Sequence, residues 1–116
     1  MTARDPAAFR RTGPARHERP DLDDAALHAA RASDRVLAAA RERGSDRWAR
    51  YFERLPDALR DGEIRDLRPT AQRVRAAFGA KDSIRDVAPP EVTEPLLDAI
   101  DRLLKALARR EASSGL

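Results

Sequence analysis

Apolar and small residues recur at three- and four-residue spacing from residue 21 onwards, which is the pattern of one face of an α-helix. The first stripe follows Asp21, a good N-cap residue, and stops before Gly44, which is well suited to end a helix. Because alanine dominates the stripe, neighbouring helices are expected to approach it closely. Its members are Leu22, Ala26, Ala29, Ser33, Val36, Leu37 and Ala40.

A second helical stripe holds the single Trp of the chain, its single Tyr and one of its three Phe. Ser45 or Asp46 is expected to cap this helix at its N-terminus. Pro56 is expected to kink or end it, since proline cannot donate the hydrogen bond to residue 52. Two interpretations stay open: the aromatic residues belong to the core, or they form a contact with a partner. The stripe consists of Trp48, Tyr51, Phe52, Leu55 and Leu59.

The spacing predicts a third helical region over residues 63–78, with Gly79 as its C-cap. Pro69 is expected to split this region into a short turn and a helix that starts near Arg68, because proline suits the first turn of a helix. The apolar positions of the region are Ile64, Leu67, Ala71, Val74 and Phe78.

The last helix is predicted to begin near Thr93 or Glu94, with Pro95 in its first turn. Its apolar stripe is wide, and we expect it to pack against Trp48, Phe52 and Phe78. The members of this stripe are Leu96, Leu97, Ile100, Leu103, Leu104 and Leu107.

These patterns predict an all-α fold, because no segment shows the period-two alternation of a β-strand. The expected architecture is a small bundle of four main helices in one domain, residues 21–112. Residues 1–20 contain three prolines and one glycine, and Phe9 supplies most of their apolar surface. We predict a flexible basic arm here; the alternative is a strap that lays Phe9 on the domain.

The positive charge of the chain is unevenly distributed. The formal net charge is +3, and residues 1–20 carry five arginines against Asp5 and Glu18. Residues 21–116 carry 18 basic and 18 acidic side chains. Residues 73–85 include a further basic stretch, which Asp82 and Asp86 offset. The net charge therefore does not imply a basic face on the helical domain.

The candidate binding residues are all arginines. One group lies in the arm, where it would contact phosphates. The other flanks the aromatic stripe at helical spacing, where Asp46 and Glu53 dilute its charge. The candidates are Arg10, Arg11, Arg16 and Arg19 in the arm, and Arg47, Arg50 and Arg54 beside the stripe.

The residues that support catalysis are scarce. The chain has no cysteine, which excludes disulfides, thiolate zinc sites and cysteine nucleophiles. His17 and His28 are 11 residues apart and make a poor set of metal ligands. The serines have no plausible His and Asp partners for a triad, and there is no Gly-x-x-x-x-Gly-Lys phosphate cradle. We therefore predict no catalytic, cofactor-binding or metal-binding residue, and no enzyme activity.

The distribution of apolar residues also bears on location. No apolar run approaches the roughly 20 residues needed to span a bilayer. The N-terminus leads into no apolar segment of the kind found in signal peptides. These features predict a cytoplasmic bacterial protein without a membrane partner.

One short motif resembles the signature of a known family. Residues 78–87 read Phe-Gly-Ala-Lys-Asp-Ser-Ile-Arg-Asp-Val. This segment is similar to the Phe-Gly-Gly-Met-Gly-Ser-Phe/Leu-Asn-Asp-Leu signature of a family of small, uncharacterised bacterial helical proteins. The family has no established activity, so the resemblance implies a helical fold and no catalytic residue. The layout that it implies, from Trp48 to the signature, is a helix, a Gly-containing turn and a second helix.

The departures from the signature change the expected loop. Ala80 and Asp82 stand where the signature has glycine, which predicts a loop that no longer needs the same positive-φ positions. Ser83 is expected to cap a new helical turn that inserts Ile84 and Val87 into the core. A conformational role of this kind explains the motif without any ligand.

Two functions remain in view from the sequence. The first is a non-catalytic protein-binding module of the immunity, antitoxin or adaptor kind, by analogy with other small helical proteins. The alternative is a nucleic-acid-associated protein that uses the arginine-rich arm, with weak and non-specific binding. A homodimer is a further possibility, because the aliphatic core is small.

Overall fold

Helices account for all the regular structure in residues 16–114, which are the residues that this computed structural model describes. The elements in chain order are η1 (Arg16–Glu18), α2 (Pro20–Glu42), α3 (Asp46–Phe52), α4 (Leu55–Asp61), α5 (Ile64–Ala76), η2 (Ile84–Asp86) and α6 (Pro90–Ser114). The predicted all-α bundle is confirmed over these residues. Residues 1–15 of the arm predicted over residues 1–20, including Arg10 and Arg11, lie outside them, whereas residues 16–20 hold η1 and the start of α2.

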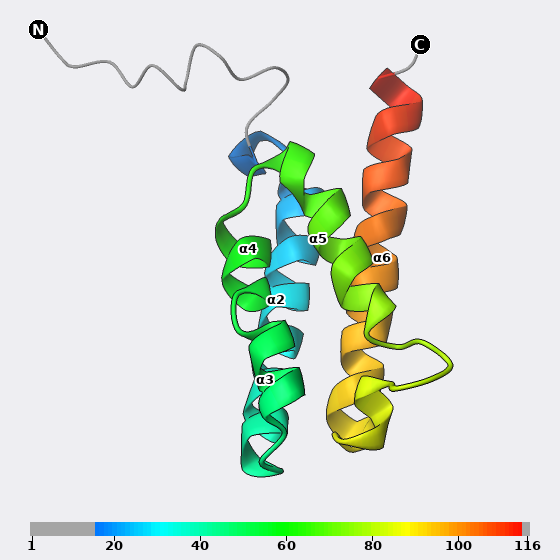
Figure 1. Ribbon diagram of the computed structural model, residues 1–116. Helices are drawn as coiled ribbons and strands as arrows, with labels where there is room; N and C mark the ends of the chain where they lie inside the picture. The colour runs from blue at the N-terminus through cyan, green and yellow to red at the C-terminus, as the bar shows by residue number, and fades with distance from the viewer. Residues whose placement is uncertain (1–15, 115–116) are drawn as a thin grey trace, which may run out of the picture.

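The two long helices, α2 and α6, run side by side in opposite directions and make the most extensive helix–helix interface. The short helices α3 and α4 follow one another along α2, and α5 packs against both α4 and α6 (Figure 1). The pair α3–α4 therefore takes the place of the single second helix in the predicted four-helix bundle.

The break between α3 and α4 follows from Pro56, as expected. The first helix of the pair ends at Phe52, and Pro56 lies in the first turn of α4, where the missing N–H costs no hydrogen bond. Both halves bury their apolar side chains, so the break keeps one stripe in contact with the core. At the far end of α4, a Cβ on Gly62 would lie 2.4 Å from the carbonyl oxygen of Ala58. Glycine is therefore required where α4 turns into α5.

Several helix ends differ from the predicted ones. Pro69 does not split its helix, because α5 is continuous from Ile64, and α6 starts at Pro90 instead of near Thr93. Pro69 and Pro95 are each the sixth residue of their helix, so each ring meets the carbonyl of the second residue, Arg65 or Glu91. Those two residues are exposed, so water can bind the freed carbonyls.

The ends of α2 and α5 show further differences. Arg19 is the N-cap of α2 in place of Asp21, because Pro20 takes the first helical position. Gly44 follows α2 with φ of +68°, as its predicted role requires. Ala77 is the C-cap of α5 in place of Gly79.

The core forms around the small residues of α2. Ala26, Ala29 and Ala40 are fully buried, and every member of the predicted stripe of α2 is buried. In α6 the centre of the predicted stripe is buried, whereas Leu97 and Leu104 at its edges are only partly covered. The described core is mostly aliphatic, with Trp48 and Phe52 as its buried aromatic residues, and the described part of the molecule measures 50 × 36 × 20 Å.

Arg16, the first described residue, has a side chain that is 12% exposed. Its Nε donates to the Asp23 carboxylate at 2.9 Å, and its Nη1 donates to the carbonyls of Leu59 at 2.9 Å and Gly62 at 2.8 Å. These carbonyls lie at the C-terminal end of α4, where helix acceptors lack partners and the helix dipole favours a cation. The expectation that Arg16 is an arm residue free to contact phosphate is therefore wrong.

We predict that truncating a side chain at the buried centre of the α6 stripe costs more stability than truncating one at its edge. Ile100 is 0% exposed, so Ile100→Ala should lower the free energy of unfolding by about 2–5 kcal/mol. Leu97→Ala, the matched control on the same helix, should cost about 1 kcal/mol or less. Urea denaturation followed by circular dichroism measures both. Equal losses for the two variants would contradict this assignment of the core.

We also predict that Arg16 contributes to stability through α4. Arg16→Met should lower the free energy of unfolding by about 1–3 kcal/mol, because two carbonyls and one carboxylate lose a charged donor. Arg19→Met is the control, since the Arg19 side chain caps nothing. Faster amide hydrogen exchange in α4 of the Arg16 variant should accompany the loss, and unchanged exchange there would refute the role.

Candidate binding cleft

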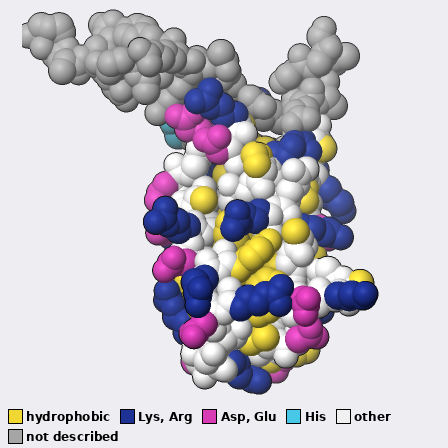
Figure 2. All heavy atoms as spheres, viewed as in Figure 1, with side chains coloured by type: hydrophobic (Ala, Val, Ile, Leu, Met, Phe, Trp, Pro, Cys, Tyr) yellow, Lys and Arg dark blue, Asp and Glu magenta, His cyan; other side chains and the backbone are white. Residues whose placement is uncertain are grey.

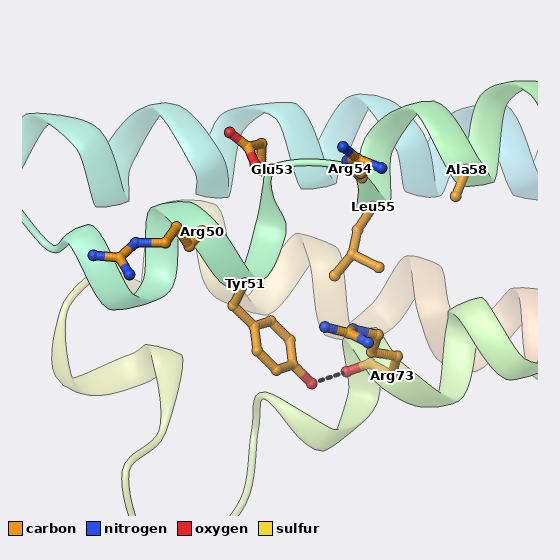
Figure 3. A pocket seen from close by; sticks show the side chains of 7 residues that line it. All are labelled: Arg50, Tyr51, Glu53, Arg54, Leu55, Ala58 and Arg73. Atoms are coloured by element: carbon orange, nitrogen blue, oxygen red, sulfur yellow. Dashed lines mark hydrogen bonds between the residues drawn. The ribbon is translucent and has the colours of Figure 1, made fainter.

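A shallow cleft of about 300 Å³ opens where the break between α3 and α4 faces α5. It exists because α3 stops at Phe52 and α4 starts in a new direction, which leaves the side chains around the break facing the second half of α5. The residues that line it are Arg50, Tyr51, Glu53, Arg54, Leu55, Ala58 and Arg73 (Figure 3).

The floor of the cleft is aromatic and aliphatic. The Tyr51 hydroxyl donates a hydrogen bond to the backbone carbonyl of Arg73 at 2.5 Å. The Arg73 guanidinium carbon lies 5.1 Å from the centre of the Tyr51 ring, a cation–π distance. Leu55 is buried beside them, and Ala58 is partly covered at the other end. Tyr51 therefore joins α3 to α5 and holds the Arg73 side chain at the edge of the floor.

Arginines surround this floor without carboxylate partners. Arg50, Arg54 and Arg73 are exposed, and none forms an ion pair with another described residue. Glu53 is the single acidic residue of the lining. In Figure 3 the side chain of Arg50 points away from Tyr51, whereas that of Arg73 lies beside the ring. The cleft thus presents separated cations, and their charges do not converge on one point.

Some other arginines of the body form ion pairs within the molecule. Arg60 pairs at 2.5 Å with Asp34 of α2 and with Asp57. Arg75 pairs with Asp101 of α6. The three arginines of the cleft form no such pair, as is also true of exposed arginines elsewhere, such as Arg35 of α2; what sets the three apart is that they surround an apolar floor.

The candidate arginines of the sequence analysis are not brought together. Arg50 and Arg54 line the cleft, but Arg47 lies 5.0 Å over the Trp48 ring and 3.7 Å from the Asp82 carboxylate. Arg16 is bound within the fold, and Arg19 stands at the start of α2. Arg47 shares α3 with Arg50, but its side chain is turned to Trp48 and Asp82 and does not line the cleft.

Arg73 was not among the candidates, although sequence reasoning noted a basic stretch at residues 73–85. Its place beside Tyr51 depends on the packing of α5 against α3, which no local pattern indicates. The aromatic stripe was open to two interpretations, a place in the core or a contact with a partner, and these apply to different residues. Trp48 is 5% exposed and Phe52 is fully buried, whereas Tyr51 reaches the cleft.

The face that contains the cleft has mixed charge. Figure 2 shows apolar side chains in a band along the middle of the molecule, with Lys and Arg on both sides of it. Asp and Glu side chains lie among these cations. A continuous basic track is therefore absent from this view of the described residues.

The segment that resembles a family signature forms a capped turn next to this face. The Ser83 hydroxyl accepts from the Arg85 amide, and the Asp86 carboxylate accepts from the Ser83 amide, both at 3.1 Å. Ile84 is fully buried and Val87 is partly buried, so the predicted insertion is confirmed. Asp82, however, has φ of +52°. The loop keeps a positive-φ position where the signature has glycine, and the contrary expectation is wrong.

An ion pair fastens this turn to α6. Arg85 donates two hydrogen bonds to the Glu94 carboxylate, at 2.8 and 3.1 Å. These bonds, more than the charge of Arg85 itself, hold the pKa of Glu94 below its ordinary value. The pair is exposed, so it orients the turn more than it stabilises the domain.

Comparison of the chain with protein-family models, curated proteins and solved structures finds no match. The resemblance of residues 78–87 to a family signature therefore stays a prediction. Within the described residues, no three His, Asp or Glu side chains are grouped as metal ligands. None of the described helices is long and apolar enough to cross a membrane.

We predict that Asp82→Gly is more stable than Asp82→Ala. Both variants lose the exposed contact with Arg47, so their difference reports the backbone alone. At φ of +52° the Cβ of alanine is strained and glycine is not, which should separate the two by about 1 kcal/mol in the free energy of unfolding. Thermal denaturation of the pair measures this, and an alanine variant as stable as the glycine variant would contradict it.

Proposed function

We propose that this chain is a non-catalytic protein-binding module that contacts its partner through the cleft between the α3–α4 break and α5. The supporting observation is the combination of an apolar floor with arginines that have no ion-pair partner. Aromatic residues and arginine are the types that dominate the energetics of protein interfaces. Tyr51 offers a fixed ring, and Arg73 offers a charge that needs no rearrangement to be reached.

The cleft is the centre of a larger contact. A stable interface covers roughly 800 Å² of each partner, which is more than a cleft of about 300 Å³ supplies. The apolar band of the same face extends the surface available to a partner (Figure 2). Fully buried contacts at the cleft, with a polar rim around them, are the usual anatomy of such an interface.

We extend the proposal to the origin, the location and the class of this protein. A bacterial, cytoplasmic protein of the immunity, antitoxin or adaptor kind fits a helical module without catalytic residues. Self-association through the same face is compatible with the proposal, because a second copy is also a protein partner. Sedimentation of the purified chain distinguishes a homodimer from a monomer that awaits another protein.

The nucleic-acid alternative relies on the arginines near the N-terminus. The structure removes Arg16 from that set, because Arg16 binds the end of α4. The carboxylates among the arginines of the described face would repel a phosphate backbone. No described feature favours this alternative over a protein partner.

Site-specific photo-cross-linking tests the proposal. Benzoylphenylalanine replaces Ala58 in the cleft, and in the control it replaces Arg35, which is exposed on α2. Cells that produce each variant are irradiated, and the cross-linked species is identified by mass spectrometry. We expect one protein partner from the cleft position and none from the control. The purified partner should then bind the full chain at least about tenfold more tightly than it binds a Tyr51→Ala variant.

A deletion separates the two functions further. Removal of residues 1–15, which carry three arginines and one aspartate, should leave partner binding intact. The deletion stops before Arg16, because that residue belongs to the fold. Nucleic-acid binding that depends on these residues would disappear, and it should fall steeply with salt in any case. Cross-links from the cleft to nucleic acid alone would overturn the proposal.

A further inference from the structure

We infer that the partner segment that enters the cleft is acidic, with carboxylates on both sides of an apolar side chain. The inference rests on the proposed function, since it describes what the protein partner brings to that cleft. Three features of the described residues support it: the unpaired charges, the directions of the arginine side chains and the anchoring of the helices on both sides of the cleft.

The charge of the lining is the first of these features. Three arginines and one glutamate surround the floor, and the arginines have no carboxylate within the described part of the chain. The structure elsewhere pairs Arg60, Arg75 and Arg85 with carboxylates of its own. Exposed arginines without a carboxylate also occur outside the cleft, such as Arg35, but those of the cleft lie together around an apolar floor and outnumber its one glutamate. Charge complementarity favours an acidic occupant.

The directions of the arginines decide between a single anion and an extended segment. A phosphate group needs several donors that converge on one point. Arg50 instead points away from Tyr51, and Arg73 lies on the other side of the ring (Figure 3). Separate carboxylates along a peptide can reach both positions, with Arg54 as a third contact at the break. The floor formed by Tyr51 and Leu55 then accepts the apolar side chain between those carboxylates.

The size of the cleft sets a limit on that side chain. A volume of about 300 Å³ lies at the lower end of the range for ligand pockets, roughly 300–1,000 Å³. It is suited to one or two medium side chains, such as leucine or phenylalanine. A larger cofactor would extend into solvent.

The helices on both sides of the cleft are held in place before any partner arrives. Arg16 binds the carbonyls at the C-terminal end of α4, and Arg60 joins α4 to Asp34 of α2. The Tyr51 hydroxyl fixes α3 to the backbone of α5. Because both sides of the cleft are anchored, binding an acidic segment orders little of the protein, which favours affinity.

A matched pair of peptides tests the inference on the full chain. The first peptide is acetylated and amidated, with a leucine and a phenylalanine flanked by glutamates. The second replaces each glutamate with glutamine. The readout is the change in amide and arginine side-chain resonances of the ¹⁵N-labelled protein. We expect the acidic peptide to bind at least about tenfold more tightly than its neutral counterpart, with the largest shifts around Tyr51, Leu55 and Arg73.

Arginine variants test whether the acidic peptide binds at the cleft. Arg50→Gln, Arg54→Gln and Arg73→Gln should each weaken binding of the acidic peptide by about three- to tenfold. Arg73→Gln keeps the Tyr51 hydrogen bond, because the acceptor is a backbone carbonyl. Arg35→Gln on α2 is the matched control and should leave binding unchanged.

Each contrary outcome has a distinct meaning. Equal affinity for the two peptides, or no shifts at the cleft at millimolar peptide, would overturn the acidic segment. A thymidine oligonucleotide that binds the cleft more tightly than the acidic peptide would overturn it in favour of phosphate. The cross-link from position 58 to a protein partner is measured independently. A neutral partner segment found there would leave the proposed function standing and would remove this inference alone.

Discussion

Close packing around α2 is the constraint on which the rest of this structure depends. Its buried face is built largely of alanine, with Ala26, Ala29 and Ala40 inaccessible to solvent. Small side chains let α6, α4 and α3 approach the same helix from different sides. A larger residue on this face would separate those helices, and overpacking a filled core is destabilising. The short helices hold their positions because α2 offers them a surface without gaps.

The seven-residue helices α3 and α4 cannot be stable by themselves, because helices of that length do not form in isolation. Tertiary contacts supply what local propensity lacks. Trp48 and Phe52 anchor α3 in the core. Arg16 binds the C-terminal end of α4, and Arg60 of α4 pairs with Asp34 of α2. The cleft lies at the break between these two helices. Its shape is thus a consequence of Pro56 and of the contacts that fix α3 and α4.

The distribution of ion pairs separates structural charge from charge that is free for binding. Arg60 and Arg75 bridge different helices through carboxylates, and Arg85 fastens the capped turn to α6. Arg50 and Arg54, at the break between the short helices, have no such partner in the described residues. The net charge of residues 21–116 is zero, and this sum does not distinguish arginines in ion pairs from arginines without a partner. Local placement, more than net charge, therefore supports an acidic partner.

The sequence alone indicated which segments are helical and that Ser83 caps a turn, because periodicity and this cap are local properties, but it misplaced several helix ends. It also located the break at Pro56, since a missing N–H acts within one turn. Tertiary structure decided what depends on distant residues. Arg16 belongs to the helical domain and not to the predicted arm, because carbonyls some 43 residues away accept its hydrogen bonds. Arg73 lines the cleft because α5 packs beside Tyr51. Local sequence patterns carry no information on contacts between distant residues, because these contacts form only when the helices pack.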